Sequence, residues 1–268
     1  MTAIALRAVR YRGLLATLTQ RELKARYRGS ALGFLWSLVN PLLLTAVYSV
    51  VFGWILAPGK GRGSVEPYAL FLISGLFPWL WASTAILEGT VSLSASAGLI
   101  RKAVFPVELP PLVAVFANLA HFVFALPVLA AALVVGRVLG FSVGGWAVLW
   151  LPVVILLQIP MLCGAALAVS ALNVLFKDVR DIVNNMMTVL FFLAPIIYSL
   201  SSIPHPWVAR AVRLNPFTPF VQAYQAVLFH GVAPSVTLWL HMAVVSLLSW
   251  WIGSWIFERL RDTLVEMS

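Results

Sequence analysis

The sequence has 268 residues, of which 62% are hydrophobic and 10% are charged, and its formal net charge is +9. Soluble globular proteins carry about 25% charged residues, so a chain this apolar is expected in a membrane. The single cysteine, Cys163, excludes a disulfide within the chain and a thiolate metal cluster. The location of the basic charge matters more than its sum, and we expect no nucleic-acid partner.

Residues 1–30 are predicted to form a cytoplasmic interface helix ahead of the membrane domain. Seven basic residues lie in this segment, and Tyr11, Leu14, Leu15 and Leu18 repeat at the spacing of one helix face. An apolar stripe flanked by cations is typical of a helix in the lipid headgroup layer. The alternative is an ordinary positively charged topology anchor.

Six apolar stretches predict an all-α integral membrane fold with six transmembrane helices over residues 31–268. About 20 residues of helix cross a hydrocarbon core of about 30 Å. The predicted spans are 31–57, 67–87, 109–135, 146–176, 182–200 and 233–257.

Six spans place both termini on one side of the membrane. Of the 18 arginines and lysines, 13 lie on that side and five on the other. Because basic residues gather on the cytoplasmic side, both termini are predicted to be cytoplasmic.

The sequence predicts no catalytic residue and no metal site. It lacks the GxxxxGK[ST], HExxH and GxSxG motifs, and the nearest phosphate-loop candidate, 59–61, lacks both the first glycine and the final Ser or Thr. His121 and His241 are expected to form hydrogen bonds between helices. Glu88 is either a functional carboxylate or a capping or snorkelling one.

The loop carboxylates Asp178 and Asp181 alternate with Lys177 and Arg180. We expect them to pair with these cations in solvent rather than to perform acid–base chemistry.

The stretch GLIRKAVFPVELPP, 98–111, places two cations among apolar residues and then a cluster of prolines. A short cytoplasmic helix over about 92–105, stopped by Pro106, fits this pattern, and Pro110 and Pro111 suit the first turn of the next span. Exposed apolar groups ringed by charge favour docking onto a protein. The alternative is that these residues lie in the headgroup layer.

Five segments of the chain resemble, in order, the permease subunits of bacterial polysaccharide exporters of the ABC type-2 class, which handle O-antigen, capsule and teichoic acid chains. They are RELKARYRGSALGFLWSLVNPLL (21–43), GLIRKAVFPVELPP (98–111), ALNVLFKDVRDIV (171–183), FFLAPIIYSLSSIP (191–204) and LNPFTPFVQAYQAVLFHG (214–231). The resemblance covers nearly the whole chain.

The resemblance implies a bacterial inner-membrane homodimer with two copies of a separate ATPase, which binds the ATP and Mg while this chain holds no cofactor. The segment at 98–111 corresponds to the family's coupling helix, which inserts into a cleft of the ATPase, and the N-terminal helix also contacts that subunit. The implied docking residues are Gly98, Leu99, Ile100, Arg101, Lys102, Phe105, Pro106, Arg21, Glu22, Lys24 and Arg26.

The polar, proline-rich stretch 201–232 corresponds to the family's short re-entrant helices, which form a gate at the periplasmic mouth. Such backbone requires protein or water to satisfy it at membrane depth. The implied gate residues are Asn215, Pro216, Phe217 and Pro219. The alternative is a simple external loop.

Spans one and five line the channel in this family, and both carry aromatic rings, which stack on sugar faces, and amides, which hydrogen-bond. The alternative is lipid-belt or helix-packing aromatics. The candidates are Trp36, Asn40, Tyr48, Phe52, Asn184, Asn185, Phe191, Phe192 and Tyr198. By contrast, Gly164, Ala168 and Ala171 indicate close helix packing.

The expected function is the ATP-driven export of a lipid-linked polysaccharide, such as O-antigen, from cytoplasm to periplasm, with membrane lipids around the dimer. One alternative is an ABC type-2 permease for a smaller lipid or drug cargo, and the many aromatics in spans one and five favour the polysaccharide. A second is an intramembrane enzyme, which would need carboxylates or histidines converging at one membrane face, and the sequence offers only scattered ones.

Overall fold

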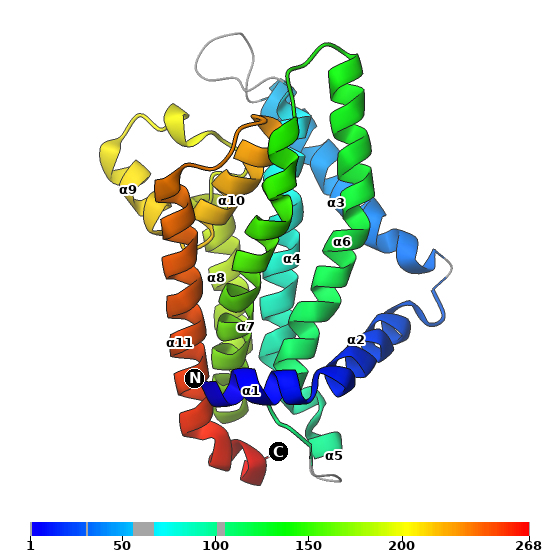
Figure 1. Cartoon of the computed structure of the whole chain (residues 1–268), viewed down its shortest axis with the longest axis vertical. Coiled ribbons are helices and arrows are strands. Elements are labelled where there is room, and N and C mark those ends of the chain that lie inside the picture. The colour runs from blue at the N-terminus through cyan, green and yellow to red at the C-terminus, as the bar shows by residue number, and fades with distance from the viewer. Residues whose placement is uncertain (1, 31, 56–66, 101–104, 268) are drawn as a thin grey trace.

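The computed structural model describes residues 2–30, 32–55, 67–100 and 105–267. Within these ranges the chain is helical and contains no strand, which confirms the predicted all-α class. Long helices run between two ends of a bundle (Figure 1). We call the end that holds both chain termini the terminal end and the opposite one the distal end.

Four of the predicted spans are helices long and apolar enough to cross a membrane: α4 (Tyr68–Ala95), α6 (Leu109–Val138), α7 (Leu151–Leu175) and α11 (Val236–Met267). A short 3-10 segment, Trp146–Trp150, leads into α7. Helix α4 is central, because it packs against α6, α7, α3 and α8. Most of its side chains are buried, so it organises the core.

The first and fifth predicted spans are shorter or less regular than expected. A 3-10 turn, Gly33–Leu35, precedes α3 (Trp36–Tyr48), and α3 continues as a π-helix, Ser49–Ile55. Helix α8 (Val179–Leu193) has 15 residues, which rise about 22 Å. Pro195 was predicted to lie inside the fifth span but follows α8, since its ring and missing N–H favour a helix end.

Small residues bring α7 and α11 into close contact, as predicted from Gly164. A Cβ added at Gly253 would lie 1.9 Å from the backbone oxygen of Gly164, so no larger residue fits there. Next to this crossing, the Ser249 hydroxyl donates to the Met161 carbonyl at 2.7 Å. The crossing therefore depends on backbone approach and serine hydrogen bonds, as is common between membrane helices.

The N-terminal segment forms two helices, α1 (Thr2–Arg10) and α2 (Arg12–Tyr27), rather than one. Helix α1 lies across the terminal end of the bundle, and α2 slants away beside α6 (Figure 1). Ile4 is fully buried against the core, whereas α2 buries no residue completely. On the predicted apolar stripe, Leu15 packs against the core and Leu14 is exposed.

The short helix predicted over about 92–105 differs from the structure at its start. Helix α4 continues to Ala95, a turn follows at Ser96, and α5 (Ala97–Ile100) forms one turn at the terminal end (Figure 1). Residues 101–104 lie outside the described ranges. Pro110 and Pro111 lie in the first turn of α6, as predicted.

At the distal end, the stretch predicted as a gate contains short helices. A 3-10 turn, Leu200–Ser202, is followed by α9 (Pro206–Leu214), α10 (Thr218–Tyr224) and a π-helical segment, Gln225–Phe229. Helix α10 is almost entirely buried and packs against α4, α7 and α11.

Candidate functional site

A cleft of about 630 Å³ lies at the terminal end between α2, α4, α5 and the start of α6. Five of the predicted docking residues line it: Arg21, Glu22, Arg26, Gly98 and Phe105. The structure therefore brings the two predicted docking segments together, although they are more than 70 residues apart in the sequence.

The remaining predicted docking residues lie around this cleft or outside the described set. Lys24 is exposed but does not line the cleft, and Pro106 is buried. Leu99 and Ile100 belong to α5, and their side chains are outside the described residues, as are Arg101 and Lys102 entirely.

The partly buried Arg26 joins three helices. Its guanidinium forms an ion pair with Glu88 on α4 and donates to the Asn118 side-chain oxygen on α6 at 3.2 Å. The Asn118 amide in turn donates to Glu88 at 2.5 Å. Arg26 was predicted to contact a partner; in the structure it lines the cleft and also holds α2 against α4 and α6. Glu88 thus has a structural ion-pair partner.

Tyr27 extends this polar cluster along α6. Its hydroxyl lies 2.9 Å from Nε2 of His121, and the two rings lie 5.5 Å apart between centroids. The prediction that His121 forms a hydrogen bond between helices is confirmed.

A second polar cluster, centred on Arg7, joins α1 to the ends of two long helices. Its Nε donates to Glu108 Oε1 at 2.5 Å, and a terminal nitrogen pairs with Glu258 of α11. Glu108 is fully buried at the start of α6. Partial burial opposes the charge on Arg7, but the two carboxylates outweigh it and raise the pKa of Arg7.

Sequence reasoning missed the Arg7 cluster, although one signal for it was present. Glu108 stands between Val107 and Leu109, two residues before the first of two prolines that open a span. A carboxylate at such an apolar boundary requires a cation, because burying an unpaired charge is costly.

An aromatic cluster connects α3, α4 and α8 in the bundle. Tyr48 stacks on Phe191 with 5.8 Å between ring centroids, and Phe191 contacts Phe192 at 5.2 Å. Tyr48 also contacts Phe52 at 6.0 Å. Four of the predicted channel residues therefore contact one another. From the sequence, only the family resemblance indicated that they belong together.

Trp79 of α4 completes this cluster and was missed from the sequence. Its ring lies 5.7 Å from Phe191 and 5.0 Å from Phe217, which was predicted as a gate residue. Phe191 is 9% exposed and packs the cluster, whereas Phe192 is 54% exposed and presents its ring outward. The Tyr198 hydroxyl donates to the Phe192 carbonyl at 3.0 Å.

The other predicted channel residues lie elsewhere. Trp36 and Asn40 line a separate cavity of about 160 Å³, which Arg26 and His121 also line. Asn184 and Asn185 are exposed on α8, nearer the terminal end than Phe191. Eight of the nine candidates thus extend along α8 and along α3 with its π-helical continuation, and Tyr198 lies in the bend after α8, so they do not form one compact site.

Asn215 connects the predicted gate to α8. Its side-chain amide donates to the Leu190 carbonyl at 2.9 Å, and its side-chain oxygen accepts the Phe217 N–H at 3.0 Å. Asn215, Phe217 and Pro219 are buried, and Pro216 is exposed. The turn between α9 and α10 is therefore held on the end of α8.

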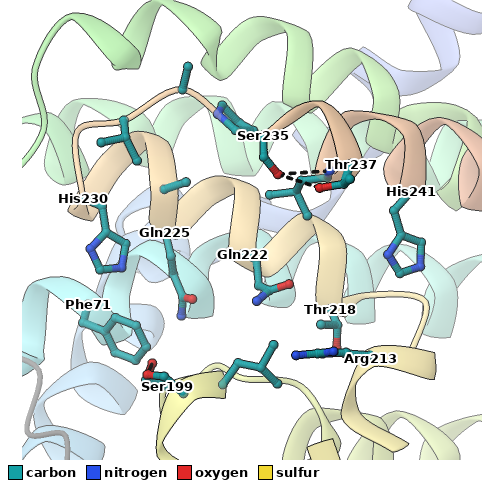
Figure 2. Close-up of a pocket in the computed structure, with 17 residues that line it drawn as sticks. Phe71, Ser199, Arg213, Thr218, Gln222, Gln225, His230, Ser235, Thr237 and His241 are labelled. Carbon is teal, nitrogen blue, oxygen red and sulfur yellow. Dashed lines mark hydrogen bonds between the residues drawn. The ribbon is translucent and has the colours of Figure 1, made fainter. Parts of the chain in front are cut away.

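A cavity of about 820 Å³ opens at the distal end, which sequence reasoning did not identify (Figure 2). We call it the distal cavity. Its lining includes Arg213, His230 and His241, with side-chain amides and hydroxyls from α10 and the neighbouring turns. Partial burial lowers the pKa of His230.

Comparison with known proteins identifies the family. A family model described as ABC-2 type transporter matches residues 13–229. The chain is 37% identical over 261 residues to the O-antigen export system permease protein RfbA of Myxococcus xanthus, with 96% of this chain and 95% of that protein covered. A protein of the same name from Klebsiella pneumoniae is 31% identical over 221 residues, covering 82% of this chain and 81% of that protein. The polysialic acid transport protein KpsM of Escherichia coli is 20% identical over 246 residues, covering 91% and 92%. The resemblance inferred from the five sequence segments is confirmed, and the chain belongs to the ABC-2 type transporter family.

Proposed function

We propose that this chain is the membrane subunit of an ATP-driven exporter that moves a lipid-linked polysaccharide, such as O-antigen, from the cytoplasm to the periplasm. The observation that carries the proposal is the similarity, over 96% of the chain, to a permease named for O-antigen export. In this proposal the terminal end faces the cytoplasm and the distal end faces the periplasm.

The cleft at the terminal end supports docking of a separate ATPase, which binds ATP and Mg and supplies the energy. Helices α2 and α5 border the cleft, so a partner seated there would contact both. Arg26 links α2 to α4 and α6, and Arg7 links α1 to α6 and α11. A displacement of α2 by the ATPase would therefore reach the long helices through short, charge-assisted contacts.

The exposed face of α8 supports a channel between two copies of the chain. Ile182, Met186, Val189 and Phe192 are each more than half exposed, and the amide of Asn185 is also exposed. Asn185 and Phe192 are seven residues apart and so share a face of the helix. An amide facing lipid is unfavourable, whereas a face with amides and rings suits a second copy around a watery passage.

The cargo is tested by mass spectrometry of lipid-linked glycans from cells depleted of this chain. We expect long glycans to accumulate on their carrier lipid inside the cell, which would also identify the glycan. An unchanged pool would contradict the polysaccharide cargo and favour a smaller lipid or drug.

The channel face is tested by comparing two neighbouring phenylalanines. Phe192→Ala removes an exposed ring, so we expect slower appearance of glycan at the cell surface with normal stability. Phe191→Ala removes a buried ring, so we expect the free energy of unfolding to fall by about 3 kcal/mol.

Phe176→Ala is the matched control for the exposed ring. Phe176 is 63% exposed at the end of α7, away from the aromatic cluster, and export should be unchanged. Normal export by Phe192→Ala would remove α8 from the proposed path.

A further inference from the structure

The distal cavity is built from segments that are distant in the sequence. Figure 2 shows His230, Gln225 and Gln222 pointing into it from one side, with Ser199 and Arg213 on the other. Its volume, about 820 Å³, lies in the range of small-molecule sites. The cavity therefore has room for a group much larger than a water molecule.

The charge of this cavity is one-sided. Arg213, His230 and His241 are all exposed to it, and no carboxylate in the described part of the chain lines it. No described carboxylate forms an ion pair with Arg213. Of the nine acidic residues, only Glu66 falls in a loop predicted at this end, and it lies outside the described residues. Such a cavity attracts anions.

The neutral lining is polar and held in place by the fold. The Ser199 and Ser201 hydroxyls lie 2.8 Å apart, and those of Ser235 and Thr237 lie 3.0 Å apart. The Gln225 amide donates to the Pro195 carbonyl at 2.8 Å. Ordered hydroxyls and amides beside a guanidinium form a donor-rich surface that matches phosphate oxygens.

We propose that the distal cavity binds a phosphate-bearing group, a phosphodiester or a diphosphate, with Arg213 as its main contact, His241 as a further donor at the same end, and His230 as a second basic group at the opposite end. Two sources share this chemistry: the headgroup of an anionic lipid and the diphosphate of a lipid that carries the cargo. Only the second source rests on the proposed function. The proposal that the cavity binds phosphate rests on the residues that line it.

Binding here would connect the short distal helices to the bundle. Arg213 belongs to α9, His230 follows the π-helical segment after α10, and His241 belongs to α11. Figure 2 shows Arg213 and His241 towards one end of the cavity and His230 at the other, so an anion that contacted Arg213 and His241 would hold α9 against α11. The proposed ligand therefore also stabilises one arrangement of the predicted gate.

The first test measures binding of inorganic pyrophosphate to the full purified chain in phosphatidylcholine nanodiscs, by calorimetry. We expect Arg213→Gln to weaken binding about tenfold, since it removes a charge-assisted contact. Arg210→Gln is the matched control, because Arg210 is exposed on the same helix but does not line the cavity. It should change the affinity less than twofold.

A second variant keeps the test informative if Arg213→Gln does not fold. His230→Gln combined with His241→Gln leaves α9 unchanged, and we expect it to weaken pyrophosphate binding severalfold at pH 6. The proposal is overturned if the wild-type chain binds no pyrophosphate, if Arg210→Gln weakens binding as much as Arg213→Gln, or if a neutral oligosaccharide displaces pyrophosphate.

The source is then distinguished by adding phosphatidylglycerol to the nanodiscs. If phosphatidylglycerol competes with pyrophosphate in the wild-type chain, and this competition is lost in Arg213→Gln, the cavity binds a lipid headgroup. Pyrophosphate binding without such competition would assign it to a diphosphate. Neither binding measurement involves the ATPase or export. A chain that does not bind pyrophosphate would therefore not contradict the proposed cargo. An unchanged glycan pool would likewise not contradict phosphate binding in the cavity.

Discussion

The terminal and distal ends of this protein use basic residues in opposite ways. At the terminal end, Arg7 and Arg26 each pair with a carboxylate from a long helix, so their charge joins helices. At the distal end, Arg213 faces a cavity that no described carboxylate lines. Paired cations stabilise the fold, whereas an unpaired cation in a polar cavity is available to a ligand.

Arg7→Gln should give the largest effect at the terminal end. It leaves Glu108 fully buried without its cation, and removal of one partner of a buried pair costs about 3–5 kcal/mol. We expect this loss in the free energy of unfolding, measured by denaturant titration in detergent.

Arg10→Gln is the control for Arg7→Gln, because Arg10 is exposed on the same helix. It should change stability by less than about 0.5 kcal/mol. The double variant Arg7→Gln with Glu108→Gln should recover part of the loss. Equal losses in the two arginine variants would contradict the structural role of Arg7.

Charge reversal of the docking segment tests the proposed partner. Arg101→Glu combined with Lys102→Glu should reduce co-purification with the ATPase about tenfold or more, which corresponds to about 1.4 kcal/mol. Membrane insertion should be unchanged.

The matched reversal at the distal end is Arg210→Glu combined with Arg213→Glu. It should leave co-purification with the ATPase unchanged, because α9 lies at the distal end, away from the cleft at the terminal end. Normal assembly of the 101/102 variant would exclude this segment from docking.

The apolar pattern predicted most accurately the helices that coincide with long apolar runs. Helices α4, α6, α7 and α11 follow long apolar runs, and Gly164 correctly indicated a close helix crossing. The end of α8 was predicted seven residues too late, because the apolar run continues through Pro195 although the helix does not. Hydropathy alone does not show where an apolar run stops being helical.

Pairing between distant residues was the part that the sequence could not provide. Arg26 and Glu88 are 62 residues apart, and Arg7 and Glu258 are 251 apart, so only the packed helices bring them together. Similarly, the lining of the distal cavity comes from at least four segments. The family resemblance predicted the docking segments but indicated none of these contacts.

Arg26→Lys separates a structural role of Arg26 from a docking role. Lysine keeps a charge near Glu88 but not the fork that also reaches Asn118, so we expect a loss of about 1 kcal/mol. Faster hydrogen exchange at the α2 amides would show it. Arg21→Lys, on the exposed side of α2, is the control. Weaker co-purification with the ATPase at unchanged exchange would instead assign Arg26 to docking.

The smallest expected effect is a pH dependence at the distal end. Partial burial lowers the pKa of His230, so its imidazole is neutral at pH 7.5. A bound phosphodiester favours the protonated imidazole, so binding takes up a proton and tightens as the pH falls. Arg213 and His241 are the other charged or titratable groups that line the cavity in the described part of the chain, and Arg213 stays charged throughout.

We expect phosphatidylglycerol to bind about threefold more tightly at pH 5.5 than at pH 7.5, measured by retention in native mass spectrometry. The dependence should vanish in His230→Gln combined with His241→Gln and persist in Arg210→Gln. A flat profile in the wild-type chain would show that neither histidine is coupled to the bound phosphate, because a phosphodiester does not itself titrate in this range.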